Sequence, residues 1–229
     1  MNVPSLMRQA TQLNCDRRAL HADERTFAFG EAGNRGVRTA NALTVLGVQS
    51  GDRIATVEDN GFPAADLFLG AAIASAVRVL LDARNFRDSH KGILRSTAAK
   101  VLFTDAHHYP SVAGLQDELP GLQHTLVQDE GYEGWLLAQS DADSEIRVAI
   151  EDWHVICHSS GTSRRSKGVS YTPARMGDEF AQLAYRHPHR AGPRCPDLPS
   201  GRLPVPADLD GRRHQPPASR FLTFPAFCG

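Results

Sequence analysis

Short apolar runs alternate with amphipathic segments through most of this chain, and this alternation limits its fold more than any other feature. The runs that predict buried strands are residues 53–57, 77–81, 100–104, 125–127 and 153–157. Helical patterns over residues 64–74 and 88–98 separate the first three runs. Strands that alternate with helices predict an α/β fold, in which a layered parallel sheet is covered by helices on both faces.

Three further elements are predicted before the first strand. They are an amphipathic helix over residues 3–13, a small β-hairpin of residues 19–22 and 26–29, and a helix over residues 37–46. Gly47 is the predicted C-terminal stop of the last helix. Its start is placed late because each of the three glycines before Val37 costs ~1 kcal/mol relative to alanine inside a helix. Residues 131–144 are too polar to be assigned to an element.

The composition is that of an ordinary soluble globular protein, with 41% hydrophobic and 22% charged residues. The 25 Lys and Arg residues nearly balance the 26 Asp and Glu residues, so charge gives no reason to expect nucleic acid as a partner. The N-terminus lacks the apolar region of a signal peptide, and no apolar stretch is long enough to span a bilayer. We therefore expect a cytoplasmic protein, whose oligomeric state the sequence leaves open.

The last part of the chain differs from the rest. Nine of the 14 prolines fall within residues 186–229, and no apolar period of a helix or strand survives there. Such a segment cannot bury enough apolar surface to offset its ordering entropy, which predicts a disordered or out-of-frame tail. We therefore divide the chain into a partial domain of residues 1–172, a segment compatible with a helix at residues 173–185, and this tail.

Residues 159–168, directly after the last apolar run, contain the strongest chemical signal. This loop carries five hydroxyl side chains, two glycines and three cations. The backbone N–H groups of such a loop can turn inward to form an anion-binding nest, with the hydroxyls as further donors. Lys167 would then neutralise phosphate charge as a mobile point cation. The loop therefore predicts a site for a polyphosphate, although a solvated Ser/Arg loop fits its composition equally well.

Two other kinds of site are disfavoured by spacing. A Walker A loop would need glycine where Ser166 stands and Ser or Thr where Gly168 follows the lysine. The four cysteines contain no CxxC pair, and the spacing of His187, His189 and Cys195 fits no common zinc pattern. We therefore assign no metal ligands. His107 and His108 are predicted to be exposed in a loop.

The loop resembles the phosphate-binding signature of adenylate-forming enzymes, which include the acyl-CoA synthetases. That signature is Ser/Thr-Ser-Gly-Thr-Thr-Gly, followed after one variable residue by Pro-Lys-Gly. The matching positions are Ser159, Ser160, Gly161, Thr162, Ser163, Lys167 and Gly168. Arg164 replaces a glycine of the signature and Ser166 replaces its proline, so we expect weakened phosphate binding.

Earlier segments resemble the same family in their order and spacing. Residues 45–55 are similar to its helix end, Gly-Asp-Arg turn and strand, and residues 98–105 are similar to a later strand. Between them, Asn60 and residues 76–84 follow the family pattern, with Asp-Ala in place of its Asn-Pro. The resemblance covers residues 3–172.

The resemblance implies an ATP-dependent acyl-CoA ligase. In this family a carboxylate attacks the α-phosphate of ATP to give an acyl-adenylate, and a thiol, usually that of coenzyme A, then displaces AMP. The implied cofactors are ATP, Mg²⁺ and coenzyme A, and the implied substrate is a carboxylic acid such as a fatty acid. The matching loop residues would hold the β- and γ-phosphates, and His158 stands where the family has an aromatic residue.

Other parts of the family pattern do not occur in this sequence. It contains no Tyr-Gly-x-Thr-Glu segment, which in the family serves adenine and magnesium, and its catalytic residues stay unassigned. We therefore expect a truncated or frameshifted product that is inactive alone. The alternatives are a non-catalytic remnant that binds nucleotide or phosphate, and a small α/β interaction module. Cys157 ends a predicted buried strand, so it is expected to act as a small hydrophobe rather than a nucleophile.

Overall fold

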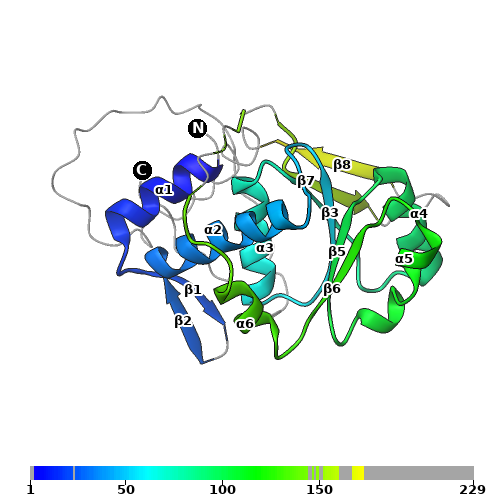
Figure 1. Ribbon diagram of the computed structural model, residues 1–229, viewed down its shortest axis with the longest axis horizontal. Coiled ribbons are helices and arrows are strands. Elements are labelled where there is room, and N and C mark those ends of the chain that lie inside the picture. The colour runs from blue at the N-terminus through cyan, green and yellow to red at the C-terminus, as the bar shows by residue number, and fades with distance from the viewer. Residues whose placement is uncertain are drawn as a thin grey trace, which may run out of the picture.

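The structure is a computed structural model that describes residues 3–22, 24–143, 146, 148–149, 152–159 and 167–172. A six-stranded sheet with the strand order β6-β5-β3-β4-β7-β8 forms its centre (Figure 1). The strands are β3 (Arg53–Val57), β4 (Val77–Leu80), β5 (Val101–Asp105), β6 (His124–Gln128), β7 (Val155–Ser159) and β8 (Lys167–Tyr171). Neighbouring strands are parallel except β7 and β8, which are antiparallel. The predicted parallel sheet is confirmed, with one antiparallel strand at its edge.

Helices lie on both sides of this sheet, as the alternation of elements predicts (Figure 1). One side carries α1 (Val3–Asn14), α2 (Phe29–Val45), α3 (Phe62–Ile73) and α6 (Tyr132–Leu137), and the other carries α4 (Arg87–Thr97) and α5 (Leu115–Glu118). A 3-10 turn, η1 (Tyr109–Ser111), precedes α5. Consecutive residues of β3 point to opposite layers. Ile54 belongs to the apolar cluster of Leu43 in α2, and Ala55 to that of Leu94 in α4.

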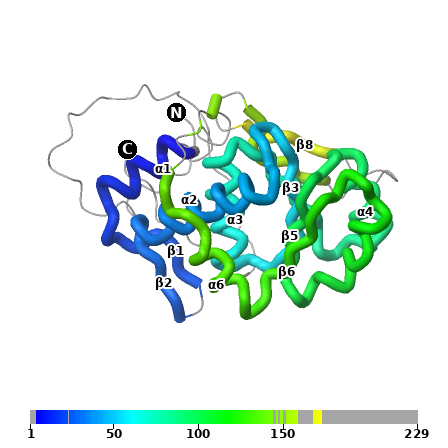
Figure 2. Tube along the Cα trace, viewed as in Figure 1, coloured from blue at the N-terminus to red at the C-terminus, as the bar shows by residue number. Residues whose placement is uncertain are grey.

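A separate ribbon of two antiparallel strands, β1 (Arg18–Ala22) and β2 (Arg25–Ala28), lies beside the helical layer and apart from the sheet (Figure 2). This confirms the predicted hairpin. Leu20 and Phe27 of the ribbon pack in one cluster with Phe62 and Leu69 of α3. An isolated two-stranded ribbon is marginal in water, so this apolar contact holds it in place.

The predicted late start of the second helix is wrong. The helix α2 begins at Phe29 and includes all three glycines that argue for a late start. A Cβ atom on Gly33 would lie 2.5 Å from Oγ1 of Thr11 in α1, and one on Gly36 would lie 3.0 Å from Cβ of Leu69 in α3. The glycines therefore allow neighbouring helices to approach α2 closely, and this packing offsets their poor helix propensity.

The end of α2 agrees with the sequence. The helix ends at Val45, and the next glycine, Gly47, has φ of 78°. Its N–H donates to the carbonyl of Thr44 at 3.0 Å. Glycine adopts this left-handed backbone without a steric penalty, which is why it stops the helix here.

The polar segment 131–144 contains one element that the sequence analysis leaves unassigned, the short helix α6. Two of its residues, Tyr132 and Leu136, are buried, and its partners come from parts of the chain far away in sequence. A single amphipathic turn among polar residues gives no clear period, so the pattern alone does not identify it.

Among the described residues, no helix combines the length and the apolar character that crossing a membrane requires. The predictions for residues 173–185 and 186–229 lie outside the described part of the chain.

Candidate functional site

The strands β7 and β8 form a hairpin that brings together the two ends of the hydroxyl-rich loop. Ser159, at the end of β7, pairs with Lys167 at the start of β8, and His158 pairs with Gly168. Of the predicted phosphate-binding residues, these ends are described, whereas Ser160, Gly161, Thr162 and Ser163 lie outside the described residues. The predicted strand that runs into this loop is confirmed, and β8 follows the loop as a second strand.

The hairpin is anchored in the sheet by backbone hydrogen bonds. Arg78 of β4 donates its N–H to the carbonyl of His154 at 2.8 Å, and the N–H of His154 donates to the carbonyl of Tyr171 at 2.9 Å. Val155 and Ile156 of β7 are buried. The base of the hairpin is therefore fixed by the sheet on one side and by its own second strand on the other.

The open end of the hairpin lies at the edge of the sheet where ligands bind in α/β proteins. The strands β3, β4, β5 and β7 run parallel, so their carboxyl ends meet at one edge. Ser159 is the last residue of β7 and therefore lies at that edge, with Lys167 opposite to it. In open α/β sheets, ligands bind in the crevice outside the carboxyl ends of the strands.

A buried ion pair lies within the sheet below this edge. Nη2 of Arg78 in β4 is 2.6 Å from Oε1 of Glu58, and Nε of Arg78 donates to Oγ1 of Thr56 at 3.2 Å. Burial raises the pKa of the Glu58 carboxyl, although the charge of Arg78 opposes the rise. The sequence analysis does not identify this pair. The sequence indicates such a pair only through Arg78 itself, because an arginine within an apolar strand needs a buried partner.

The charge of Arg78 also acts on the first strand of the hairpin. Burial, together with the nearby positive charge of Arg78, lowers the pKa of His154 to about 4. Burial raises the pKa of the Cys157 thiol, which Arg78 only partly opposes. A thiol with a raised pKa is a poor nucleophile. This agrees with the expectation that Cys157 acts as a small hydrophobe.

Three polar side chains lie close together at the same edge of the sheet. Asp59 follows β3, Asp105 is the last residue of β5, and His108 follows β5. Ligand atoms of Asp59, Asp105 and His108 lie within 4.8 Å of one another. However, the Asp105 carboxylate accepts the backbone N–H of Asp59 at 2.8 Å and that of His108 at 2.7 Å, and the His108 ring nitrogen Nδ1 lies 2.8 Å from it. These bonds outweigh burial and lower the pKa of Asp105. The carboxylate thus closes the loop after β5, and the prediction that His108 is simply exposed is wrong.

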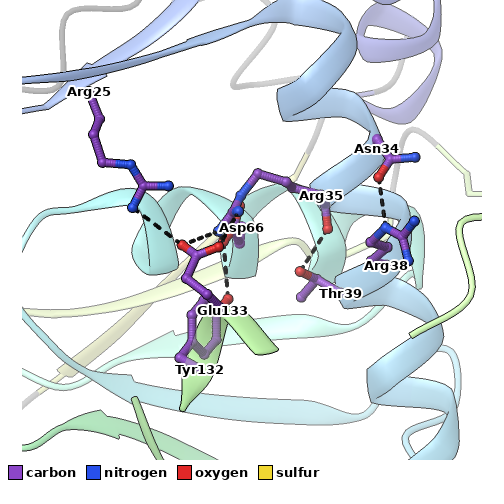
Figure 3. A network of polar contacts seen from close by, with 8 residues as sticks. All are labelled: Arg25, Asn34, Arg35, Arg38, Thr39, Asp66, Tyr132 and Glu133. Atoms are coloured by element: carbon purple, nitrogen blue, oxygen red, sulfur yellow. Dashed lines mark hydrogen bonds and ion pairs between the residues drawn. The ribbon is translucent and has the colours of Figure 1, made fainter. Parts of the chain in front are cut away.

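A second polar network, shown in Figure 3, joins α2, α3 and α6. In Figure 1 these helices lie across the sheet from α4. Arg35 of α2 binds Asp66 of α3 through two hydrogen bonds of 2.9 and 2.6 Å, and binds Glu133 of α6 at 2.7 Å. The hydroxyl of Tyr132 donates to Asp66 at 3.1 Å, and Arg25 lies 3.7 Å from Glu133. Burial opposes the charge of Arg35, but its two carboxylate partners outweigh burial and raise its pKa.

Arg35 and Asp66 are almost fully buried, with side-chain exposures of 5% and 1%. Each charge is paired in a bidentate geometry, which is the arrangement that makes a buried ion pair tolerable. The bonds described above tie its members to one another. This network therefore holds α2, α3 and α6 together.

Comparison with known proteins supports the resemblance noted from the sequence. A protein-family model described as "AMP-binding enzyme" matches residues 6–195. The 3-methylmercaptopropionyl-CoA ligase of Ruegeria lacuscaerulensis is 31% identical over 157 residues, which is 63% of this chain and 29% of that protein. The crotonobetaine/carnitine–CoA ligase of Escherichia coli is 30% identical over 146 residues, which is 59% of this chain and 28% of that protein.

Solved structures share the fold. A benzoate CoA ligase from Burkholderia xenovorans superposes with a TM-score of 0.69 and 20% identity over 81% of this chain and 36% of that chain. The chain thus spans less than a third of the length of the two curated relatives, at 29% and 28%.

Proposed function

Because this chain belongs to the family of AMP-binding enzymes, we propose that its β7–β8 hairpin and the connecting loop bind the phosphates of ATP. The observation that carries the proposal is the placement of Ser159 opposite Lys167 at the carboxyl edge of a parallel sheet. The loop between them is rich in hydroxyl groups and cations. Backbone amides, hydroxyls and a lysine form the donor set that suits a polyphosphate.

The chemistry of the described strands agrees with an anionic ligand. The residues of β7 and β8 include no carboxylate, so nothing on these two strands repels phosphate. The same donor set offers no carboxylate ligand for Mg²⁺. Magnesium would therefore reach the site as the partner of the ATP phosphates rather than through these two strands.

We place this site within an acid–thiol ligase reaction. The substrate carboxylate attacks the α-phosphorus of ATP, and the bond between this phosphorus and the oxygen that bridges to the β-phosphate breaks. The products of this step are the acyl-adenylate, which stays bound, and pyrophosphate, which leaves. The thiol of coenzyme A then attacks the acyl carbon and releases AMP. In the first step, Lys167 and the loop donors would neutralise the charge that develops on the departing pyrophosphate. The named relatives are CoA ligases, and a carboxylic acid, fatty acids included, is therefore the proposed substrate class.

The phosphate site is tested by ATP binding. Isothermal titration of the full chain with Mg-ATP should give a measurable Kd, and Lys167→Ala should weaken it by roughly ten- to a hundredfold, since a hydrogen bond to a charged group contributes ~1.5–3 kcal/mol. Lys91→Ala is the matched control, because Lys91 lies in α4, outside the hairpin, and forms an ion pair with Glu118 of α5. If both variants bound Mg-ATP with the affinity of the parent chain, Lys167 would have no role in binding phosphate.

Adenylation by this chain alone is tested by ATP–pyrophosphate exchange with a panel of fatty and aromatic acids. We expect no exchange above background, because the sequence lacks the Tyr-Gly-x-Thr-Glu segment of the family. Exchange with any acid would instead make the chain an adenylating enzyme in its own right. ATP binding without exchange supports the non-catalytic, phosphate-binding form of the proposal, and absence of ATP binding favours the α/β interaction module.

A further inference from the structure

A hollow of about 310 Å³ opens beside β6, on the side of the sheet that carries α6. Its main lining residues are Phe103 of β5, Leu126 and Gln128 of β6, Asp129 after that strand, and Tyr132 and Trp135 of α6. Sites for small molecules start at ~300 Å³. The hollow is therefore large enough for one small organic molecule.

Aromatic rings form much of its wall. The ring centroid of Trp135 lies 5.7 Å from that of Tyr132 and 6.4 Å from that of Phe103, and both pairs are tilted. Phe103 is fully buried, whereas Trp135 is partly exposed. Of these three rings, that of Trp135 is therefore the accessible one, whereas Tyr132 and Phe103 are buried.

These aromatic side chains are held in place before any ligand arrives. The Tyr132 hydroxyl is bonded to the buried Asp66, and the adjacent Glu133 is bonded to Arg35 (Figure 3). Because α6 is fixed through two neighbouring residues, the wall it provides does not need to be ordered on binding. Preorganisation of this kind reduces the entropy cost of binding.

The charge of the lining selects the ligand. Asp129 supplies a carboxylate, Glu130 follows it, and no lysine, arginine or histidine is among the described residues that line the hollow. An anion would therefore meet no positively charged side chain among these residues. A cation with apolar substituents would have the Asp129 carboxylate and the partly exposed ring of Trp135 as neighbours, and aromatic rings attract cations through the ring quadrupole.

We propose that this hollow binds a small organic cation of the alkylated ammonium class. The strand β6 is separated from β7 by three other strands, β5, β3 and β4. The cation site is therefore distinct from the phosphate-binding hairpin. The proposal of a cation site does not depend on whether the chain binds ATP.

The test uses choline and its uncharged carbon isostere, 3,3-dimethylbutan-1-ol, as probes. The chain contains two tryptophans, so the Trp153→Phe variant reports on Trp135 alone by fluorescence. Choline should bind saturably and about tenfold more tightly than the alcohol, which is the range of a partly desolvated cation–π contact. Equal affinity for the two probes, or no saturable binding of choline, would overturn the proposal.

Two further variants locate the site. Asp129→Asn keeps an acceptor for the N–H of Gly131, which the aspartate accepts at 2.8 Å. This variant should weaken the affinity for choline several-fold and leave the affinity for the alcohol unchanged. Isothermal titration, which needs no tryptophan signal, compares the next two variants. Trp135→Leu should abolish the preference for choline, whereas Trp153→Leu keeps it because Trp153 lies outside the hollow. If Asp129→Asn, which removes only a charge, left choline binding unchanged, the charge assignment would be wrong.

Discussion

At the scale of single residues, the base of the hairpin depends on a histidine that is kept neutral. His154 is 2% exposed, and its ring packs edge-on against Phe68 of α3 with the centroids 4.9 Å apart. Among the described atoms, its Nε2 has no hydrogen-bond partner. Protonation would bury a second positive charge near Arg78, which is why the pKa of His154 falls to about 4.

We predict that His154 makes the folded protein sensitive to acid. The unfolded chain binds a proton at this histidine with the ordinary pKa of 6.5, whereas the folded chain does so only with a pKa of about 4. Its contribution is therefore fully present above pH 6.5 and is lost as the pH falls toward 4, by up to ~3 kcal/mol.

The His154→Phe variant keeps a ring against Phe68 but cannot be protonated. Its free energy of unfolding in urea should fall less between pH 7 and pH 4.5 than that of the parent chain. The same pH dependence in both proteins would show that His154 is already charged in the folded state, or that it titrates normally there.

The Arg35–Asp66 pair predicts a second effect at the residue scale. Arg35→Met leaves the Asp66 carboxylate buried without its ion partner and should cost ~3–5 kcal/mol of stability. The double variant Arg35→Met/Asp66→Leu should be more stable than Arg35→Met alone, because no unpaired charge is then buried. Arg84→Met is the control, since Arg84 is bound to Asp82 at an exposed position, and its urea midpoint should not change. A double variant less stable than Arg35→Met would contradict this account.

At the scale of elements, the close approach of α2 and α3 is the feature that organises the helical layer. A Cβ atom on Gly70 of α3 would lie 2.4 Å from both Cβ and Cγ2 of Thr39 in α2. Thr39 is fully buried, and its hydroxyl donates to the carbonyl of Arg35 at 2.9 Å. Neither helix can therefore give way without disturbing the neighbouring polar network.

Gly70→Ala is predicted to destabilise the protein by ~1–3 kcal/mol through overpacking. Gly92→Ala is the matched control, because Gly92 lies in α4 and a Cβ atom there would meet nothing within 4 Å. That variant should gain up to ~1 kcal/mol from helix propensity. Urea unfolding measures both. A stabilising Gly70→Ala would show that the two helices are not in close contact at this position.

The elements differ in how far the sequence predicts them, and the reason is the range of the interactions involved. The parallel strands β3, β4, β5, β6 and β7 follow from local apolar runs, and the structure confirms them. The start of α2 does not follow, because its glycines are explained by contacts with Thr11 and Leu69. The short helix α6 and the Arg35–Asp66 pair join residues that are distant along the chain, and a single sequence carries no signal for such pairs.

The phosphate site stays a prediction, because Ser160, Gly161, Thr162 and Ser163 lie outside the described residues. Its residue types lie within one loop, so the sequence alone indicates a phosphate ligand at Ser159 and Lys167. The structure adds the pairing of those two residues across the hairpin and their position at the carboxyl edge of the sheet. The ion pair of Arg78 and Glu58 below that edge depends on the pairing of strands β3 and β4, and the sequence analysis does not find it.

At the scale of the whole molecule, the sheet organises two separate surfaces. The hairpin with the proposed phosphate site is at one end of the strand order, and β6 with the aromatic hollow is at the other. Helices on both faces bury the strands between them (Figure 1). The proposal for the first surface rests on the resemblance to the family, whereas that for the second rests on the aromatic and acidic residues of this chain.

The central claim is that the β7–β8 hairpin holds a polyphosphate, and amide chemical shifts measured during a titration with tripolyphosphate test it most directly. The account predicts that the largest shifts fall on the amides of Ser159, Lys167, Gly168 and the loop between them, and that they saturate. Amides of β6 serve as the internal control and should not move. Shifts spread over exposed lysines and arginines elsewhere, with the hairpin amides unchanged, would contradict the account.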